Sequence, residues 1–452
     1  MHFVFENNTP HNQTNFVNCS DVNPSGIRRF TVSPVADIIL SLSNNTSPLL
    51  SGLTNTYAAT CSTIPPTDSA YIVASGVTHS PDDWAGGRGD GKESVFSFIS
   101  PALMHDIRNK KAFLMLDQTH EGYQTDWLWS WFHENFYTYK IPPGQIIYIT
   151  GNLLAESQYI TWAQEHNIKE KMCVLAHPHF EAMIYETAAN FNKDLVPSVS
   201  KGSRTPTFID HVKYKENNLD VIKVYNALQK RPRAHRFWLF KHLVDAGLLN
   251  DGINTINSFT YSHVYMDNKH LEKIEFDKIA ALTPIMPAET QNNIQEFVSE
   301  CGGNYIATLN EHTMLNSYVS VISEASASDF DHTCFISEKT FKPIACYHPF
   351  IIWGNKGSLG FLKDLGYKTF SPYIDESYDN LSTWDRLNAI IKELKKIQSI
   401  PATDRINWYK QFENILHYNF EILKRNSKLK MFPVVEKLYD YVNNVQKTDK
   451  TN

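Results

Sequence analysis

Several features that would assign this chain to a familiar class are missing from it. Its six cysteines are scattered over 452 residues, and none belongs to a CxxC pair or to a histidine cluster with zinc spacing. Scattered cysteines of this kind are typical of free thiols in a reducing compartment. No apolar run reaches the roughly 18 residues of a membrane-spanning helix, and the start, MHFVFENNTP, lacks the basic and apolar regions of a signal peptide. We therefore expect a protein of the cytoplasm with no membrane span.

Complete catalytic and phosphate-binding motifs are absent as well. No GxSxG nucleophile elbow occurs. The run Gly86–Lys92 fits GxxxxGK, but Glu93 follows it where a phosphate-binding loop has the Ser or Thr that ligates magnesium. His177 and His179 have no third metal ligand near them in the sequence. A net charge of −6 and a pI of about 6.3 argue against a long nucleic acid as the main partner, because such proteins usually carry a basic face.

The chain does contain ample material for a packed core. Hydrophobic residues make up 42% and aromatic residues 13%, without a long low-complexity tract, and the length suits two domains. After residue 65, short apolar runs alternate with helical patterns, which is typical of βαβ units and a parallel sheet. The expected strands of this first series are 69–77, 111–117, 145–152 and 170–177, with helices at 123–137 and 154–166.

A second series of the same kind begins near residue 220. Its expected strands are 219–227, 317–325 and 348–354, and its expected helices are 233–249, 288–302, 337–346 and 358–366. Further helices are expected at 380–398, 402–424 and 431–446. The predicted fold class is therefore α/β, with two Rossmann-like αβα lobes and a helical C-terminal tail. We expect domains at 1–215, 216–400 and 401–452, the last formed by helices that pack on the lobes.

One polar cluster in the second series is suited to binding a ligand. The strand 317–325 runs into Glu324, and a helix is expected to begin at Ser337, with Glu338 and Lys339 in its first turn. A helix N-terminus and a lysine suit an anionic diphosphate, while a carboxylate can accept hydrogen bonds from a ribose diol. The pair thus fits half of a nucleotide sugar. The plainer alternative is that Glu338 only stabilises the helix dipole and that Lys339 is solvated.

Two arginines follow the expected strand 219–227. Arg233 and Arg236 lie at the start of helix 233–249, beyond the carboxyl end of that strand, where ligands bind in open α/β sheets. A guanidinium matches phosphate well, and fixed cations would stabilise the growing negative charge of a diphosphate leaving group without a metal. The alternative is a surface arginine on an amphipathic helix.

Two separate segments resemble a known family. Residues 320–354, SVISEASASDFDHTCFISEKTFKPIACYHPFIIWG, look like the donor signature of the α-1,3-fucosyltransferase family. That signature is a strand with an acidic end, a polar loop, an aromatic-x-x-Glu-Lys helix start and a strand entering a glycine. Residues 225–247, YNALQKRPRAHRFWLFKHLVDAG, are similar to the family's other donor segment, with Asn226 after a strand and Arg236 before spaced apolar residues. Residues 357–379 also look like glycosyltransferases carried by large tailed bacteriophages.

The resemblance implies a fold of the GT-B type and an inverting, metal-independent transfer of a sugar. A nucleotide-diphosphate sugar would be a co-substrate bound by the C-terminal lobe, with Arg236 and Lys339 on the diphosphate and Glu338 on the ribose or donor sugar. The family has Tyr where this chain has Phe335 and Asn where it has Ala325, which leaves the donor sugar and base open. The whole predicted donor site comprises Arg236, Arg233, Asn226, Glu324, Phe335, Ser337, Glu338 and Lys339.

A base for such a transfer is expected in the N-terminal lobe, because an inverting reaction must remove the acceptor hydroxyl proton. The strand 111–117 ends in Asp117, and His120 and Glu121 follow at a sheet edge where a ligand could bind. The candidates for the base are Glu121 and Asp117, with His120 third. The alternative is an ordinary loop before a core-facing aromatic helix.

The leading hypothesis is a glycosyltransferase that moves a hexosyl or pentosyl group to a glycan hydroxyl or a modified nucleic-acid base. If the chain is phage-encoded, it would act in the host cytoplasm. One alternative is a metal-dependent transferase, because Asp329 and Asp331 form a DxD pair that could hold a divalent cation on a pyrophosphate. Another is a nucleotide- or glycan-binding protein without turnover.

Overall fold

A computed structural model describes much of the chain: residues 2–4, 60–62, 69–76, 95–122, 127–190, 206–229, 232–256, 259–266, 269–282, 309, 311–327, 333–429 and 431–451. Contacts divide the chain into two compact units. The first unit comprises Met1–His179, His332–Phe335 and Lys428–Asn452, and the second comprises Phe180–Asp331 and Ile336–Ser427. The expected domain ranges 1–215, 216–400 and 401–452 stay predictions, because grouping by contact does not test which segments fold independently.

The first unit is built on a parallel sheet. Its strands are β1 (His2–Val4), β2 (Thr60–Ser62), β3 (Tyr71–Gly76), β4 (Ala112–Gln118), β5 (Ile146–Thr150) and β6 (Cys173–Ala176). They lie in the order β2-β1-β3-β4-β5-β6, and every neighbouring pair is parallel. Strand order therefore reverses between β1 and β3, and the segments that follow these two strands, 5–59 and 77–94, lie outside the described residues.

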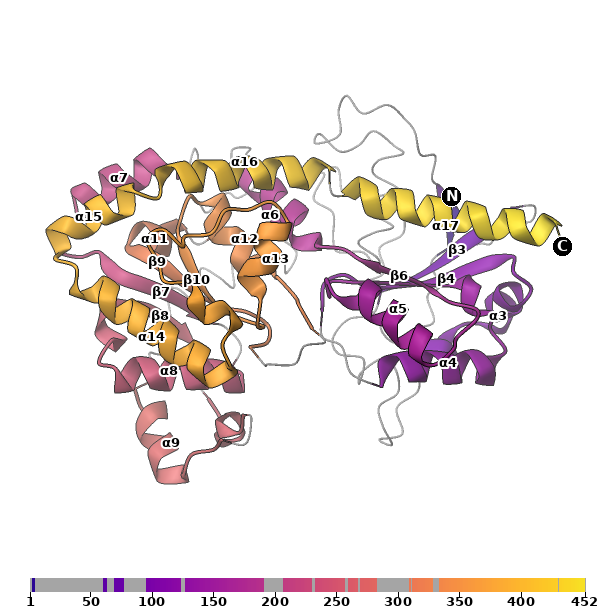
Figure 1. Cartoon of the computed structure of the whole chain (residues 1–452), viewed down its shortest axis with the longest axis horizontal. Coiled ribbons are helices and arrows are strands. Elements are labelled where there is room, and N and C mark those ends of the chain that lie inside the picture. Colours follow the sequence, from indigo (N-terminus) through magenta and orange to yellow (C-terminus); the bar gives the residue numbers. More distant parts are fainter. Residues whose placement is uncertain are drawn as a thin grey trace. The chain divides into compact units, whose positions relative to one another are not determined.

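Helices cover both faces of this sheet (Figure 1). They are α3 (Pro101–Arg108), α4 (Leu128–Tyr139) and α5 (Ala155–Glu165) on one face and α17 (Met431–Thr451) on the other. Alternation along β4 explains this, because side chains of a strand point to opposite faces in turn. Leu114 and Leu116 enter the core under α3, α4 and α5, whereas Phe113 and Met115 enter the core under α17. The last helix of the chain thus completes the core of the unit that holds the first strand.

The second unit is built on a smaller parallel sheet. Its strands are β7 (Lys223–Gln229), β8 (Gly252–Ile256), β9 (Ser317–Ser323) and β10 (Phe350–Trp353). They lie in the order β10-β9-β7-β8, and all neighbours are parallel. The chain passes from β7 to β8 on one side and later to β9 on the other side. Strand order therefore reverses between β7 and β9.

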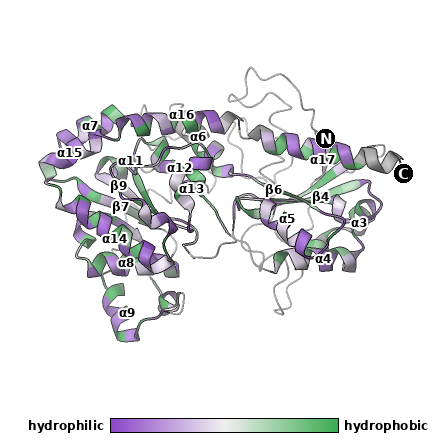
Figure 2. Ribbon diagram, viewed as in Figure 1, coloured by the Kyte–Doolittle hydropathy of each residue, from purple (hydrophilic) through white to green (hydrophobic). Residues whose placement is uncertain are grey.

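Helices also flank this second sheet, with α8 and α14 on one side and α7 and α11 on the other (Figure 1). Helices such as α14 and α17 carry both hydrophilic and hydrophobic residues, as expected for helices with one buried face (Figure 2). The α/β fold class with a helical C-terminal region is confirmed. The helices of this unit are α6 (His179–Asn190, which begins in the first unit), α7 (Phe208–Glu216), α8 (Ala234–Asp245), α9 (Lys273–Ala280), α11 (Glu311–Leu315), α12 (Glu338–Ala345), α13 (Ser358–Asp364), α14 (Thr383–Ser399), α15 (Ala402–Lys410) and α16 (Glu413–Leu429).

The structure differs from the expected elements at several places. The single helix expected at 402–424 is two helices, α15 and α16. Strand β8 was not expected, because a five-residue edge strand with Gly252 and Asn254 has weak strand propensity. The helix expected at 288–302 lies outside the described residues. Within the described part of the chain, no helix combines the length and apolar character needed to cross a membrane.

Candidate functional site

The strand order of the second sheet reverses between β7 and β9, and the candidate site lies at the carboxyl ends of these two strands. In open α/β sheets, ligands bind beyond the carboxyl ends of the strands at such a reversal, because the connecting chains diverge there. The segment after β7 leads to Arg233 and helix α8, and the segment after β9 begins with Glu324. The expected donor-binding residues Arg233, Arg236 and Glu324 therefore lie at this position.

Three side chains from the start of α8 hold the backbone that follows β9. The guanidinium of Arg236, only 4% exposed, donates from NH2 to the carbonyl oxygens of Ser323 (3.3 Å) and Glu324 (3.2 Å). His235 Nε2 lies 3.0 Å from the same Glu324 carbonyl, and Arg233 donates to the Ala325 carbonyl. Burial and the charge of Arg236 hold the pKa of His235 well below its usual range. The cations expected to bind phosphate thus also fix the loop beside them.

The carboxylate of Glu324 anchors the N-terminus of α12. It accepts hydrogen bonds from Ser337 N (3.2 Å), from Ser337 Oγ and from Thr340 Oγ1 (2.6 Å), and Glu324 is 1% exposed. Ser337 is the N-cap of α12, as expected, because its Oγ accepts from the backbone of Lys339. Glu324 is therefore a support of the site, and its carboxylate oxygens face the protein's own donors.

A charged cluster occupies the first turns of α12. Lys339 Nζ donates to Glu338 Oε1 (2.7 Å) and to Ser337 Oγ (3.0 Å), and the side chains of Glu338 and Lys339 are 13% and 27% exposed. Burial raises the pKa of Glu338, but the charges of Lys339 and Lys342 outweigh it, and the pKa falls to about 2. Burial lowers the pKa of Lys342 to about 8, against the opposing charge of Glu338. The cluster is thus an ionised carboxylate between two ammonium groups.

Arg236 contacts Glu324 directly, and Lys339 is linked to the same residue through Ser337. Arg236 donates to the Glu324 carbonyl, and Lys339 donates to the Ser337 hydroxyl that is bound to the Glu324 carboxylate. The cationic groups of α8 and α12 therefore meet at the same end of the sheet. This arrangement suits a diphosphate, because two cations on separate elements can contact its two phosphoryl groups.

Two of the expected donor-binding residues lie elsewhere. Asn226 is buried within β7, where its amide nitrogen donates to Ser317 Oγ (2.7 Å) and Ser320 Oγ (3.0 Å) of β9. Phe335 belongs to the first unit, and its ring occupies the space beside Gly122 and Gly151 that a Cβ atom at either glycine would need. A role for these two residues in donor binding stays a prediction.

The three candidate bases lie at the end of β4 in the first unit, with Asp117 in the strand and His120 and Glu121 after it. Asp117 is buried, and its Oδ1 accepts from Thr119 N (3.1 Å) and Thr119 Oγ1 (2.7 Å). His120 and Glu121 lie in the turn that follows and are partly exposed. The structure thus brings the three residues together at the carboxyl end of the first sheet, and the choice between them stays a prediction.

The candidate His120 belongs to a group of three imidazoles, with His177 and His179. The His120 and His179 rings meet edge to face with centroids 4.6 Å apart, and His177 lies 6.2 Å from His179. Burial and the two neighbouring imidazoles hold the pKa of His179 well below its usual range. The described residues nevertheless contain no group of three ligands that could hold a metal ion. Asp329 and Asp331 lie outside the described residues.

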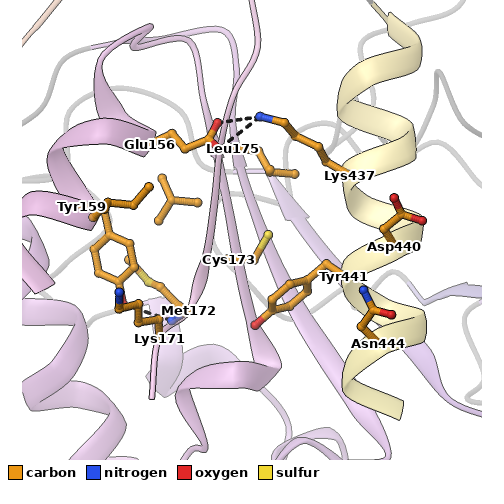
Figure 3. Close-up of a pocket in the computed structure, with 12 residues that line it drawn as sticks. Glu156, Tyr159, Lys171, Met172, Cys173, Leu175, Lys437, Asp440, Tyr441 and Asn444 are labelled. Carbon is orange, nitrogen blue, oxygen red and sulfur yellow. Dashed lines mark hydrogen bonds and ion pairs between the residues drawn. The ribbon is translucent and has the colours of Figure 1, made fainter. Parts of the chain in front are cut away.

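A cavity of about 420 Å³ lies in the first unit between α5, β6 and α17 (Figure 3). The ion pair between Lys437 and Glu156 (2.8 Å) borders it, and the thiol of Cys173 lies in its wall. Burial raises the pKa of Cys173 to about 12, so the thiol is not a nucleophile at neutral pH. We therefore place the functional site at the end of the second sheet and not in this cavity.

Two members of the site were missed in the sequence. Lys342 lies four residues after Glu338 on the expected helix, and this spacing alone could have indicated the pair. Thr340 bonds the Glu324 carboxylate, a contact between residues that no local pattern links.

No protein-family model matches the chain, and no curated protein matches it. Among solved structures, it is similar to an α1,3-fucosyltransferase at 8% identity, with 98% of this chain and 90% of that chain covered and a TM-score of 0.37. It is similar to an α,α-trehalose 6-phosphate synthase from Burkholderia multivorans at 12% identity, covering 82% and 72%, with a TM-score of 0.38. A UDP-forming α,α-trehalose-phosphate synthase from Burkholderia vietnamiensis matches at 11% identity, covering 98% of both chains, with a TM-score of 0.40. All three TM-scores are below 0.5.

Proposed function

We propose that this protein is a glycosyltransferase that takes its sugar from a nucleotide-diphosphate donor bound at the carboxyl end of the second sheet. The observation that carries the proposal is that Arg236 contacts Glu324 directly and Lys339 is linked to it through Ser337, at the reversal of strand order. Arginine and lysine from two helices match the two phosphoryl groups of such a donor. The two helix-flanked parallel sheets agree with a fold of the GT-B type.

The site residues divide the work in this proposal. The leaving group is a nucleoside diphosphate whose negative charge grows as the bond to the sugar breaks, and the fixed cations Arg236, Lys339 and Lys342 stabilise that charge. Glu338 stays ionised at neutral pH and accepts hydrogen bonds from donor hydroxyls. The acceptor is a glycan or a nucleic-acid base, and one of Asp117, His120 and Glu121 removes its proton. The transfer inverts the sugar configuration and needs no metal.

A panel of nucleoside diphosphates and nucleotide sugars tests the proposal. Ligand binding stabilises a folded protein by about 2.7 kcal/mol at a hundredfold excess over Kd, so a true donor should raise the melting temperature above the rest of the panel. Release of nucleoside diphosphate from that donor should continue in EDTA. Loss of release in EDTA would instead favour the metal-dependent alternative with Asp329 and Asp331. Binding without any release would favour a binding protein, and a flat panel would refute the donor site.

A variant pair links the result to the site. Arg236→Ala should weaken donor binding roughly a hundredfold, as expected when one partner of a buried charge pair is removed. Lys241→Ala is the matched control, because Lys241 lies on the same helix and pairs with Asp245 (2.6 Å) and Glu275 (3.2 Å) instead. Equal losses in the two variants would contradict the proposed site.

A further inference from the structure

A buried arginine of α14 also contacts the loop that follows β9. The buried face of α14 is mostly apolar, with Leu387, Ile390 and Leu394 on it, yet Arg386 lies on the same face and is 1% exposed. Its NH2 donates to the carbonyl of Ala327 (3.0 Å), its NH1 donates to the carbonyl of Leu381 (2.9 Å), and its guanidinium lies over the Trp353 ring at 5.5 Å.

Burial of this cation is unfavourable, so the contacts that its guanidinium makes indicate its structural role. Removing a charge from water costs several kcal/mol, and an apolar side chain of similar volume would fill the same space without that cost. The buried Asp379 is an acidic neighbour of Arg386, and its carboxylate accepts from the backbone of Leu359 (3.1 Å) and Gly360 (3.2 Å). The contacts of Arg386 include directed hydrogen bonds to the backbone carbonyls of Ala327 and Leu381, and contacts of this kind position a loop.

Arg386 contacts the same segment after β9, residues 324–327, as Arg236 and His235 of α8. Arg236 and His235 hold the carbonyl of Glu324, and Arg386 holds the carbonyl of Ala327 three residues later. Trp353 connects the two sets, because its Nε1 donates to the carbonyl of His235 (3.0 Å) while its ring lies under Arg386. The segment 324–327 is thus held by buried donors at Glu324 and at Ala327.

We propose that Arg386 is a positioning residue of the donor site: by holding the carbonyl of Ala327, it keeps the segment 324–327 in one conformation beside the diphosphate. The inference rests on the proposed function for its ligand, but the state of the loop can be measured without any ligand. Arg386 does not contact the donor in this proposal, so it acts on affinity through the loop.

Arg386→Met tests this, because methionine fills the space and removes the donors. We expect the variant to stay folded and to bind the nucleoside diphosphate that stabilises the wild type about tenfold more weakly. Hydrogen exchange should speed up at the amides of 324–327 while the amides of β7 and β8 keep their protection. Should Arg386→Met fail to fold, Trp353→Phe replaces it, since it removes only the Nε1 donor and should give the same loop-specific exchange with a smaller loss of affinity.

Arg405→Met is the matched control. Arg405 also donates to two carbonyls, of Gln398 (2.9 Å) and Ile400 (2.7 Å), and also lies over a ring, that of Tyr318 at 5.6 Å, but at the opposite end of β9. The variant Arg405→Met should leave the affinity for the nucleoside diphosphate and the hydrogen exchange at residues 324–327 unchanged. Wild-type affinity and exchange in the folded test variant, or equal effects in Arg405→Met, would overturn the inference. A wild type that binds no nucleotide, with faster loop exchange in Arg386→Met, would refute the proposed function while sustaining the positioning role.

Discussion

Two cations of the candidate site, Arg236 and Lys342, have properties that bear on binding of a diphosphate. Arg236 fixes the carbonyls of Ser323 and Glu324, and a guanidinium has five N–H donors, so one side chain can hold a loop and also meet a ligand oxygen. Lys342 lies beside Glu338 and Lys339, and burial brings its pKa to about 8. Its charge therefore changes just above neutral pH, where an exposed lysine would stay protonated.

Donor affinity should consequently depend on pH. Below pH 8 Lys342 is charged and attracts the diphosphate, and above it the charge is lost, so we expect Kd to rise roughly tenfold between about pH 7 and pH 9.5. The diphosphate becomes more negative as the pH rises through this range, so its own titration does not explain weaker binding. Calorimetric titration of a nucleoside diphosphate measures the change, and Lys342→Met should remove most of it. A pH dependence that is the same in this variant would show that another group is responsible.

The free energy of unfolding should follow the same group in the opposite direction. The folded-state pKa of Lys342 lies below the usual value of 10.5, so between about pH 8 and pH 10.5 the unfolded chain binds more protons and stability from this residue rises with pH. Weaker binding at high pH is thus not explained by unfolding at this residue.

At the scale of elements, the N-terminus of α12 is the part on which the account depends. Ser337 caps the helix, bonds the Glu324 carboxylate and accepts from Lys339 Nζ. Ser382 caps α14 in the same way, with its Oγ accepting from Asp385 N, but it has no contact with the charged cluster of α12 among the hydrogen bonds of the described residues. The two serines therefore separate helix capping from ligand binding.

We expect Ser337→Ala and Ser382→Ala each to lower the free energy of unfolding by about 1 kcal/mol through loss of the cap. Only Ser337→Ala should also weaken donor binding, several-fold, because Lys339 loses the hydroxyl that orients it. Chemical denaturation and donor titration of both variants measure the two effects. Unchanged donor affinity in Ser337→Ala would show that α12 does not carry the site.

Close packing around Phe335 gives a second prediction at this scale. The three atoms nearest to a Cβ at Gly122 all belong to Phe335, at 2.5 Å. A Cβ at Gly151 would lie 2.6 Å from the Phe335 ring and 2.9 Å from the backbone oxygens of Thr119 and Glu121. Gly122→Ala should cost about 1–3 kcal/mol of stability, and the added change Phe335→Leu should recover part of it. Gly360→Ala, with nothing within 4 Å, is the control. If Phe335→Leu recovers none of the stability lost in Gly122→Ala, then Phe335 does not pack against Gly122.

The sequence predicted elements whose signal is local. Buried parallel strands such as β4 and β5 are continuous apolar runs, and they lie within a few residues of their expected bounds. Arg236, Glu324 and Lys339 were proposed as site residues because strand ends and helix starts mark where ligands bind, and their role stays a prediction. The contact of Arg386 with Ala327, and the packing of Phe335 on two glycines of the first unit, depend on tertiary structure, and no spacing in the sequence encodes them.

At the level of the whole molecule, segments from the two ends of the chain share one hydrophobic core. The first unit contains the early strands, yet α17 at the other end of the chain supplies Val434, Val435 and Leu438 to its core. Leu438→Ala should therefore cost about 2–5 kcal/mol of stability, because it leaves a cavity against the sheet. The exposed Asp440 on the same helix gives the control Asp440→Ala, with little effect expected. Equal, small losses in both would mean that α17 does not close this core.

In the proposed site, one diphosphate contacts cations from α8 and α12 together. The most direct measurement is a double-mutant cycle on the Kd of a nucleoside diphosphate, with Arg236→Ala, Lys339→Ala and the double variant. Groups that contact the same ligand couple by about 0.5–3 kcal/mol, so we predict that the losses from the two single changes will not add. Losses that add to within about 0.5 kcal/mol, or wild-type Kd in either single variant, would contradict the account.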